Sequence, residues 1–209
     1  MTTQPHGPQR EQEPARESER ERGRTVEGAG QGALLETDRL LLRPFTAADA
    51  PSVQRLAGDS DIARTTLNIP HPYPDGAAEA WIQAANEAER AGAQYMRAMV
   101  RKDSGELVGC VGLGVAQRHH RAELAYWVGR PWWNLGYASE AALRMVQFAF
   151  TDLGLHRVWA AAMPHNPASM RVMEKIGMRR EGHLRHHAFK DGHFIDLVYY
   201  GIVKGDPLP

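Results

Sequence analysis

The stretch that decides the fold is WVGRPWWNLGYASEAALRMVQFAF, residues 127–150. A predicted strand, residues 122–128, leads into a loop that contains Gly129, Pro131 and Gly136, which are typical of a tight strand-to-helix turn. A helix is predicted to follow from about Gly136, because apolar residues then recur at spacings of three and four. These apolar positions are Leu143, Val146, Phe150 and Leu153.

The turn before this helix has the properties of an anion-binding site. The first N–H groups of a helix have no intrahelical partner and lie at the positive end of the helix dipole, where a phosphate can bind. Gly136 lets ligand oxygens approach the backbone, and the small residues Ala138 and Ser139 follow it. An ordinary strand-to-helix turn with a buried helix explains the same residues, so this stretch alone leaves both interpretations open.

Composition narrows the classes of protein to consider. The 209 residues carry 25 basic and 25 acidic side chains, which provides no basic footprint for nucleic acid. No apolar run approaches the roughly 20 residues of a membrane span, and the first residues lack the apolar core of a signal peptide. The single cysteine, Cys110, excludes an internal disulfide and lies in an apolar run that predicts a buried thiol. We therefore expect a cytoplasmic protein that binds neither nucleic acid nor membrane.

The chain divides into two unequal parts. Residues 1–32 are rich in Gln, Pro, Glu, Arg and Gly and have few large apolar side chains, so we expect a disordered N-terminal extension. Residues 33–209 are expected to form one domain.

The domain alternates strands and helices in mixed order. This pattern of six or seven strands and four helices predicts a single α/β (α+β) domain with a mixed sheet. Residues 59–75 are expected to form a loop because three prolines interrupt them, and Asp75 is expected to cap the second helix, with Trp81, Ala85 and Ala88 on one face. The predicted strands are residues 34–43, 95–101, 107–115, 122–128, 157–163, 178–189 and 194–203. The predicted helices are residues 47–57, a segment following Asp75, and residues 136–153 and 167–176.

Four segments together resemble one known family. They are LETDRLLLRPF (35–45), AYWVGRPWWNLGYASEAA (125–142), HNPASMRVMEKIGMRREG (165–182) and KDGHFIDLVYYGIV (190–203). In this order and spacing they resemble the GNAT superfamily of acyl-CoA N-acyltransferases, and within it the ribosomal-protein N-acetyltransferases of the RimJ/RimL type. The resemblance covers about residues 35–203. It implies a largely antiparallel sheet with splayed central strands, and acetyl-CoA as co-substrate without a metal.

The resemblance also implies how the cofactor is held. The family loop reads Gln/Arg-x-x-Gly-x-Gly/Ala, and Gly136 and Ala138 occupy its last two fixed positions. Trp133 replaces the first residue, and Asn134 and Leu135 stand where glycine and a basic residue are usual, which predicts weaker cofactor binding. Arg130 is either a phosphate contact or a solvated surface residue. The candidate cofactor-binding residues are Trp127, Val128, Trp133, Asn134, Leu135, Gly136, Tyr137, Ala138, Ser139 and Asn166.

Three residues are candidates for the chemistry. Asn166 and Ser169 match the family's Asn-x-x-Ser, in which the asparagine contacts the pantetheine arm or positions water and the serine protonates the departing sulfur. A plain helix N-cap with a first-turn serine explains the same pair. Glu123, at the start of a strand entering the site, is the candidate base, with a surface carboxylate as the alternative. A histidine near His186–His187 or water would otherwise do this task.

The implied reaction transfers an acetyl group from acetyl-CoA to a primary amine. In the family a backbone N–H of the strand that corresponds to residues 122–128 polarises the thioester carbonyl, so the resemblance implies an N–H near residues 126–128 for this task. The acceptor is a protein N-terminal amine, a small-molecule amine or an aminoglycoside-type antibiotic. A catalytically silent acyl-CoA-binding sensor is the alternative from another class. Trp132 and Trp133 either cover the cofactor, line a homodimer contact or pack ordinarily. The adjacent histidine pairs point to opposite strand faces, so no metal site is expected.

Overall fold

The computed structural model describes residues 30–209. Most of the predicted disordered extension therefore lies outside the described residues. Its last three residues contact the folded part, where the Gly32 N–H donates to the Glu89 carboxylate at 2.8 Å. Arg97 donates to the Gly30 carbonyl at 3.2 Å and forms a buried ion pair with Glu89. The described chain thus begins against this buried pair.

Eight strands form one sheet in the order β1-β2-β3-β4-β5-β6-β8-β7. Neighbouring strands are antiparallel except for β5 and β6. The strands are β1 (Leu35–Glu36), β2 (Leu40–Arg43), β3 (Gln94–Arg101), β4 (Leu107–Ala116), β5 (Arg121–Val128), β6 (Arg157–Ala162), β7 (Arg179–Lys190) and β8 (His193–Val203). The α-helices of residues 30–209 are α2 (Ala50–Ala57), α3 (Ser60–Thr65), α4 (Ala77–Arg90), α5 (Tyr137–Thr151) and α6 (Pro167–Lys175).

This architecture confirms the predicted mixed, largely antiparallel single domain but corrects two counts. The described residues contain eight strands rather than six or seven, because the predicted strand 34–43 divides into β1 and β2. They contain five α-helices rather than four, because part of the expected loop 59–75 forms α3. The Asp59 side chain accepts a hydrogen bond from the Asp61 N–H at 2.8 Å, so a local N-cap starts α3.

Helix α4 also differs from its prediction. Its N-cap is Gly76, in the left-handed region with φ of 76°, rather than Asp75. The buried positions of α4 are Ala78, Ile82, Ala85 and Glu89. Trp81 is partly buried instead and packs edge-on against Phe45, with ring centroids 4.9 Å apart. The Trp81 indole therefore packs against the outside of this apolar cluster and is not part of its buried interior.

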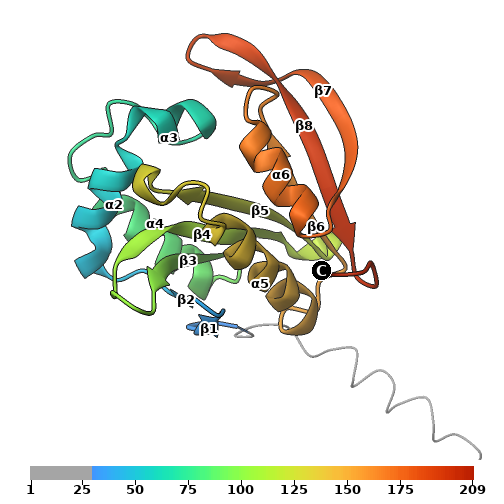
Figure 1. Ribbon diagram of the computed structural model, residues 1–209, viewed down its shortest axis with the longest axis horizontal. Helices are drawn as coiled ribbons and strands as arrows, with labels where there is room; N and C mark the ends of the chain where they lie inside the picture. The colour runs from blue at the N-terminus through green and yellow to red at the C-terminus, as the bar shows by residue number, and fades with distance from the viewer. Residues whose placement is uncertain (1–29) are drawn as a thin grey trace, which may run out of the picture.

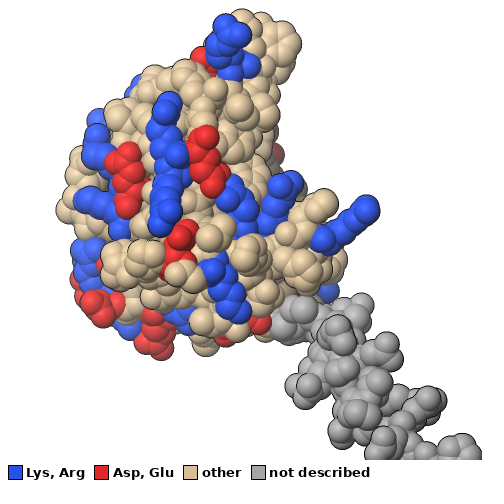
Figure 2. All heavy atoms as spheres, turned by 90° about the vertical axis from the view of Figure 1, so that its right-hand side faces the viewer, with Lys and Arg blue, Asp and Glu red and all other residues tan. Residues whose placement is uncertain are grey.

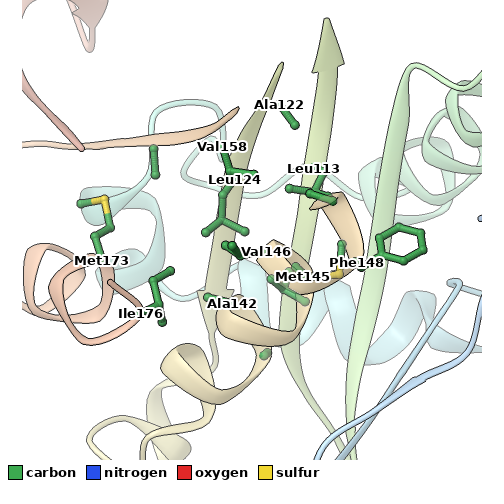
Figure 3. Close-up of a cluster of buried hydrophobic side chains, with 14 of the residues drawn as sticks. Leu113, Ala122, Leu124, Ala142, Met145, Val146, Phe148, Val158, Met173 and Ile176 are labelled. Atoms are coloured by element: carbon green, nitrogen blue, oxygen red, sulfur yellow. The ribbon is translucent and has the colours of Figure 1, made fainter. Parts of the chain in front are cut away.

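Two apolar clusters cover the two faces of the sheet. Helices α5 and α6 cover one face, and α2 and α4 cover the other (Figure 1). Figure 3 shows Ala142, Met145, Val146 and Phe148 of α5 packed against side chains of β4, β5 and β6. Burial of each large side chain contributes roughly 1.5–3 kcal/mol. The predicted apolar helix face is confirmed at Val146 and Phe150, and Leu153, which lies just after the end of α5, is also buried.

The central strands separate, as predicted. The parallel pairing of β5 with β6 covers only Arg121–Glu123 against Arg157–Trp159. Beyond Glu123 the later residues of β5 pair with β4 alone. Main-chain groups of β5 are therefore available on the side that faces β6.

The surface carries charges of both signs. On the face in Figure 2, Lys and Arg side chains are interspersed with Asp and Glu side chains. Within residues 30–209, no helix is long and apolar enough to cross a membrane.

Candidate active site

A cavity of about 970 Å³ runs along the separated part of β5 and β6. This volume is at the upper end of the roughly 300–1,000 Å³ typical of ligand pockets. Because side chains alternate along β5, the cavity has two halves. The α5 half is lined by residues 133–139 and by side chains of α6. The α4 half is lined by Trp81, Trp127, Gly112 and Gly114 of β4, and residues 65–70, 73 and 74.

The N-terminus of α5 opens into the α5 half. Its N-cap is Gly136, with φ of 85°, and no side chain caps the helix. Asn134 also has a positive φ of 63°, so the loop turns twice before the helix. The amides of Tyr137, Ala138 and Ser139 are the first donors of the helix, and all three residues line the cavity. The geometry fits an anionic group such as a pyrophosphate.

Arg39 brings a positive charge to this loop. Its guanidinium donates to the Leu135 carbonyl at 3.0 Å and lies 4.6 Å from the centre of the Tyr137 ring. Its Nε donates to the Glu140 carboxylate at 2.7 Å, which ties it to the first turn of α5. Sequence reasoning missed this residue, although it lies in the quoted segment 35–45. The two partners are 96 residues apart, and no local pattern connects them.

Arg130 is engaged elsewhere. It forms an ion pair with Asp61 of α3, and its guanidinium lies 4.8 Å from the centre of the Trp133 ring. The Trp133 indole N–H donates to the Val128 carbonyl at 2.5 Å. Trp133, at the position usually held by Gln or Arg, therefore packs the loop onto the end of β5.

Two amides of β5 face the gap. The Gly129 N–H donates to the Val108 carbonyl of β4 at 2.8 Å. Amide directions alternate along a strand, so the Trp127 amide also faces β4, whereas those of Tyr126 and Val128 face β6. The prediction of an N–H near residues 126–128 thus narrows to these two donors.

Tyr126 and Ser169 meet in the α5 half. The Tyr126 and Ser169 hydroxyls lie 2.9 Å apart, and the Tyr126 O–H also lies 3.1 Å from the Ser169 carbonyl. Burial raises the pKa of Tyr126 to about 12, and the hydrogen bond with Ser169 opposes that rise. Asn166 Oδ1 accepts from the Ser169 N–H at 3.1 Å, which confirms the predicted N-cap of α6. Met173, further along α6, is fully buried.

Sequence reasoning considered only the amide of Tyr126. The alternation of β5 was the available signal, because Tyr126 shares a face with the buried Leu124. The partner on α6 is 43 residues away, so the hydroxyl pair required the folded structure.

Glu123 faces the α4 half, on the opposite face of β5 from Tyr126. It pairs across the sheet with Gly114 of β4 and Trp159 of β6. The side chain reaches solvent in the cavity, yet partial burial raises the pKa of its carboxyl group above the ordinary value. A Cβ at Gly114 would meet no atom within 4 Å, so open space lies beside Glu123.

The predicted histidine alternative lies outside the cavity lining. His187 Nε2 is 2.8 Å from the Tyr199 hydroxyl, and the Tyr199 ring stacks on Trp159 with centroids 5.1 Å apart. Asp196 lies 2.8 Å from His183 Nε2 and accepts from the His186 N–H. Within residues 30–209, no group of three or more His, Cys, Asp or Glu side chains is arranged to hold a metal ion.

Comparison with known proteins decides the family. A profile described as "Acetyltransferase (GNAT) domain" matches residues 39–179. The chain belongs to the GNAT family of acetyltransferases. The protein is 34% identical over 174 residues to the uncharacterized N-acetyltransferase YoaA of Bacillus subtilis, which covers 82% of this chain and 97% of YoaA.

Two further relatives are consistent with this assignment. The [Ribosomal protein uS5]-alanine N-acetyltransferase of Escherichia coli is 27% identical over 184 residues, covering 84% of this chain and 93% of that enzyme. The fold is shared with Mycobacterium smegmatis RimJ in complex with CoA-disulfide, with a TM-score of 0.76 and 23% identity over 84% of this chain and 89% of that one. The protein is a GNAT N-acetyltransferase that uses acetyl-CoA and acts on an amine.

Proposed function

We propose that this acetyltransferase joins acetyl-CoA and a primary amine in one ternary complex, with direct transfer between them. The observation that carries the proposal is the continuity of the cavity, which connects the amides at the start of α5 with Glu123. Holding both reactants in one orientation lowers the barrier by up to about 7–11 kcal/mol in ideal cases. The acceptor is a protein N-terminal amine or a small-molecule amine.

The α5 half is proposed to bind the cofactor. The amides of residues 135–139 hold the pyrophosphate, and Arg39, whose charge is paired with Glu140, fixes the loop through its bond to the Leu135 carbonyl. Bound acetyl-CoA supplies the acetyl group as a thioester. The Tyr126 and Val128 amides donate to the thioester carbonyl oxygen and stabilise the negative charge that develops there.

Glu123 is proposed as the base. It accepts the proton that the amine loses as the new C–N bond forms, either directly or through one water molecule. Partial burial raises the pKa of its carboxyl group, which makes the carboxylate a better proton acceptor than an exposed one. An α-amino group with a pKa of about 8 needs less help than a lysine amine at about 10.4.

Ser169 is proposed as the acid, with Tyr126 as its hydrogen-bond partner. The Ser169 hydroxyl donates its proton to the departing thiolate, the adjacent Tyr126 hydroxyl passes its own proton to Ser169, and Tyr126 regains a proton from solvent before the next turnover. The high pKa of Tyr126 keeps that hydroxyl protonated near neutral pH. Asn166 holds the first turn of α6 in place through its cap.

Kinetics of Ser169→Ala and Tyr126→Phe test this proposal. We expect either substitution to lower kcat by roughly 10²-fold, the lower end of the 10²–10⁴-fold that a positioned proton donor contributes, with little change in the KM of acetyl-CoA. Ser104→Ala, in the turn after β3 and outside the cavity lining, is the matched control and is expected to retain kcat. Wild-type kcat in both Ser169→Ala and Tyr126→Phe would remove the pair from the mechanism.

The cellular setting also stays a proposal. The Cys110 thiol is buried, and burial raises its pKa well above the ordinary range, so it suits a structural role in a reducing cytoplasm. A homodimer remains a prediction.

A further inference from the structure

The floor of the α4 half is made of residues with little or no side chain. Gly112 and Gly114 of β4 pair with Ala125 and Glu123 of β5, so their Cα atoms face the same side of the sheet. The Met96 thioether covers Gly112, because a Cβ there would collide with its sulfur, whereas a Cβ at Gly114 would enter open space. The sheet surface is therefore hollowed next to the Glu123 carboxylate.

Large aromatic side chains line the same half of the cavity. Trp81 is fixed edge-on against Phe45, and the Trp132 ring lies against Gly129. Trp127 projects from β5 on the same face as Glu123, and Tyr73 completes the aromatic wall from the loop after α3. Each of these rings offers a flat apolar surface, and aromatic groups pack on one another in offset or edge-on geometry.

Charge in the cavity does not match a polycation. Of the described residues that line the cavity, Glu123 is the one carboxylate, and Arg171 and Lys175 of α6 add positive charge. Asp61 of α3 lies outside the cavity lining and is paired with Arg64 and Arg130. A polyamine or aminoglycoside would leave its further ammonium groups without a carboxylate partner there.

We infer that the α4 half selects a primary amine carried on an aromatic or similarly large apolar group, with the amine at Glu123 and the group on the glycine floor. This inference rests on the proposed function, because it assigns the acceptor to that half. Such an amine occurs free or as the first residue of a peptide. Gly114 leaves open the space that the large apolar group occupies next to the amine, and it is therefore the specificity-determining position.

Coenzyme A release measures this selection with a panel of acceptors. Phenylalanine amide and phenethylamine are compared with alanine amide, spermidine and kanamycin, and peptides beginning with Phe or Ala distinguish the two sources. We expect at least a 10-fold higher kcat/KM for the phenyl-bearing member of the amide or peptide pair. Spermidine and kanamycin are expected at least 10-fold below phenethylamine. Equal rates within both Phe/Ala pairs, or a preference for the polycations, would overturn the inference.

A pair of glycine variants tests the pocket itself. Gly114→Val is expected to lower kcat/KM for phenylalanine amide at least 10-fold, with at most a 2-fold change for alanine amide and for the KM of acetyl-CoA. Gly182→Val on β7 is the matched control, because Gly182 also has open space around its Cβ position but lies outside the cavity lining. Equal losses for both amides in Gly114→Val would contradict the assignment.

Equilibrium binding separates this inference from the proposed function. Phenethylamine is expected to change the fluorescence of the tryptophans around the floor at concentrations at least 10-fold lower than spermidine. If this preference holds while no amine releases coenzyme A, the proposed transfer fails and the pocket assignment stands. If amines are acetylated without any preference for the phenyl group, the pocket assignment fails and the transfer stands.

Discussion

The α5 half of the cavity is built mainly from one continuous stretch, residues 133–139, whereas the α4 half takes its walls from segments as distant as Tyr73, Met96 and Trp127. The first half relies on main-chain amides, which every residue provides, and on a helix start fixed by Gly136. The second relies on the size and chemistry of individual side chains. A backbone site tolerates changes of side chain, so Trp133 and Leu135 occupy a loop in which other residues are usual. A side-chain site changes its ligand whenever its residues change.

The largest expected effect falls on the α4 half, at Glu123. Glu123→Gln is expected to lower kcat by about 10²-fold or more, since a positioned base contributes roughly 10²–10⁴-fold. Only the carboxylate accepts a proton, so wild-type activity should rise with pH through the raised pKa of Glu123, and the variant should lose this limb. The measurement is kcat against pH at saturating substrates. An unmoved profile would assign the base elsewhere.

The next largest effect falls on the α5 half, at Gly136. Gly136→Val places a branched side chain at φ of 85°, which costs of order 1–3 kcal/mol and disturbs the loop. We expect the KM of acetyl-CoA to rise about 10-fold while the KM of the amine stays within 2-fold. Gly154→Val, at φ of 62° with open space around it, is the control for backbone strain outside the cavity. A similar rise in that control would make the effect general rather than local.

The smallest expected effect concerns Arg39. Arg39→Ala removes the bond to the Leu135 carbonyl and the charge beside the loop, so we expect a 3- to 10-fold higher KM for acetyl-CoA with kcat preserved, on the scale of roughly 0.5–1.5 kcal/mol for one hydrogen bond. Arg39→Lys should recover part of the affinity at low salt. Arg101→Ala, at the end of β3, is the control. An unchanged KM in Arg39→Ala would mean that the amides suffice alone.

These halves also differ in how far the sequence predicts them. The helix after Gly136 and the N-cap at Asn166 follow from local patterns of three or four residues, and both are present. The contact of Arg39 with Leu135 and the hydroxyl pair of Tyr126 with Ser169 join segments that no periodicity connects. Such contacts depend on the order of strands in the sheet, which a single sequence leaves open.

Two errors of secondary structure have local causes. The prolines at 70, 72 and 74 suggested an irregular loop from residue 59. Helix α3 nevertheless forms at Ser60–Thr65, because Asp59 caps it and all three prolines come after its end. At the start of α4, the N-cap is Gly76 in the left-handed conformation, and Asp75 lies one residue before the cap. At α3 the sequence analysis gave more weight to the prolines than to Asp59, and at α4 it gave more weight to Asp75 than to Gly76.

A crystal structure of the protein with bound coenzyme A most directly tests the assignment of the cofactor to the α5 half and of the amine to the α4 half. The account predicts pyrophosphate oxygens within about 3.2 Å of the amides of residues 137–139, the usual limit of an N–H···O bond. It also predicts the sulfur in the gap beside Ser169, with the glycine floor of the α4 half free of the cofactor. A pyrophosphate bound away from the start of α5, or a pantetheine arm lying on Gly112 and Gly114, would contradict it.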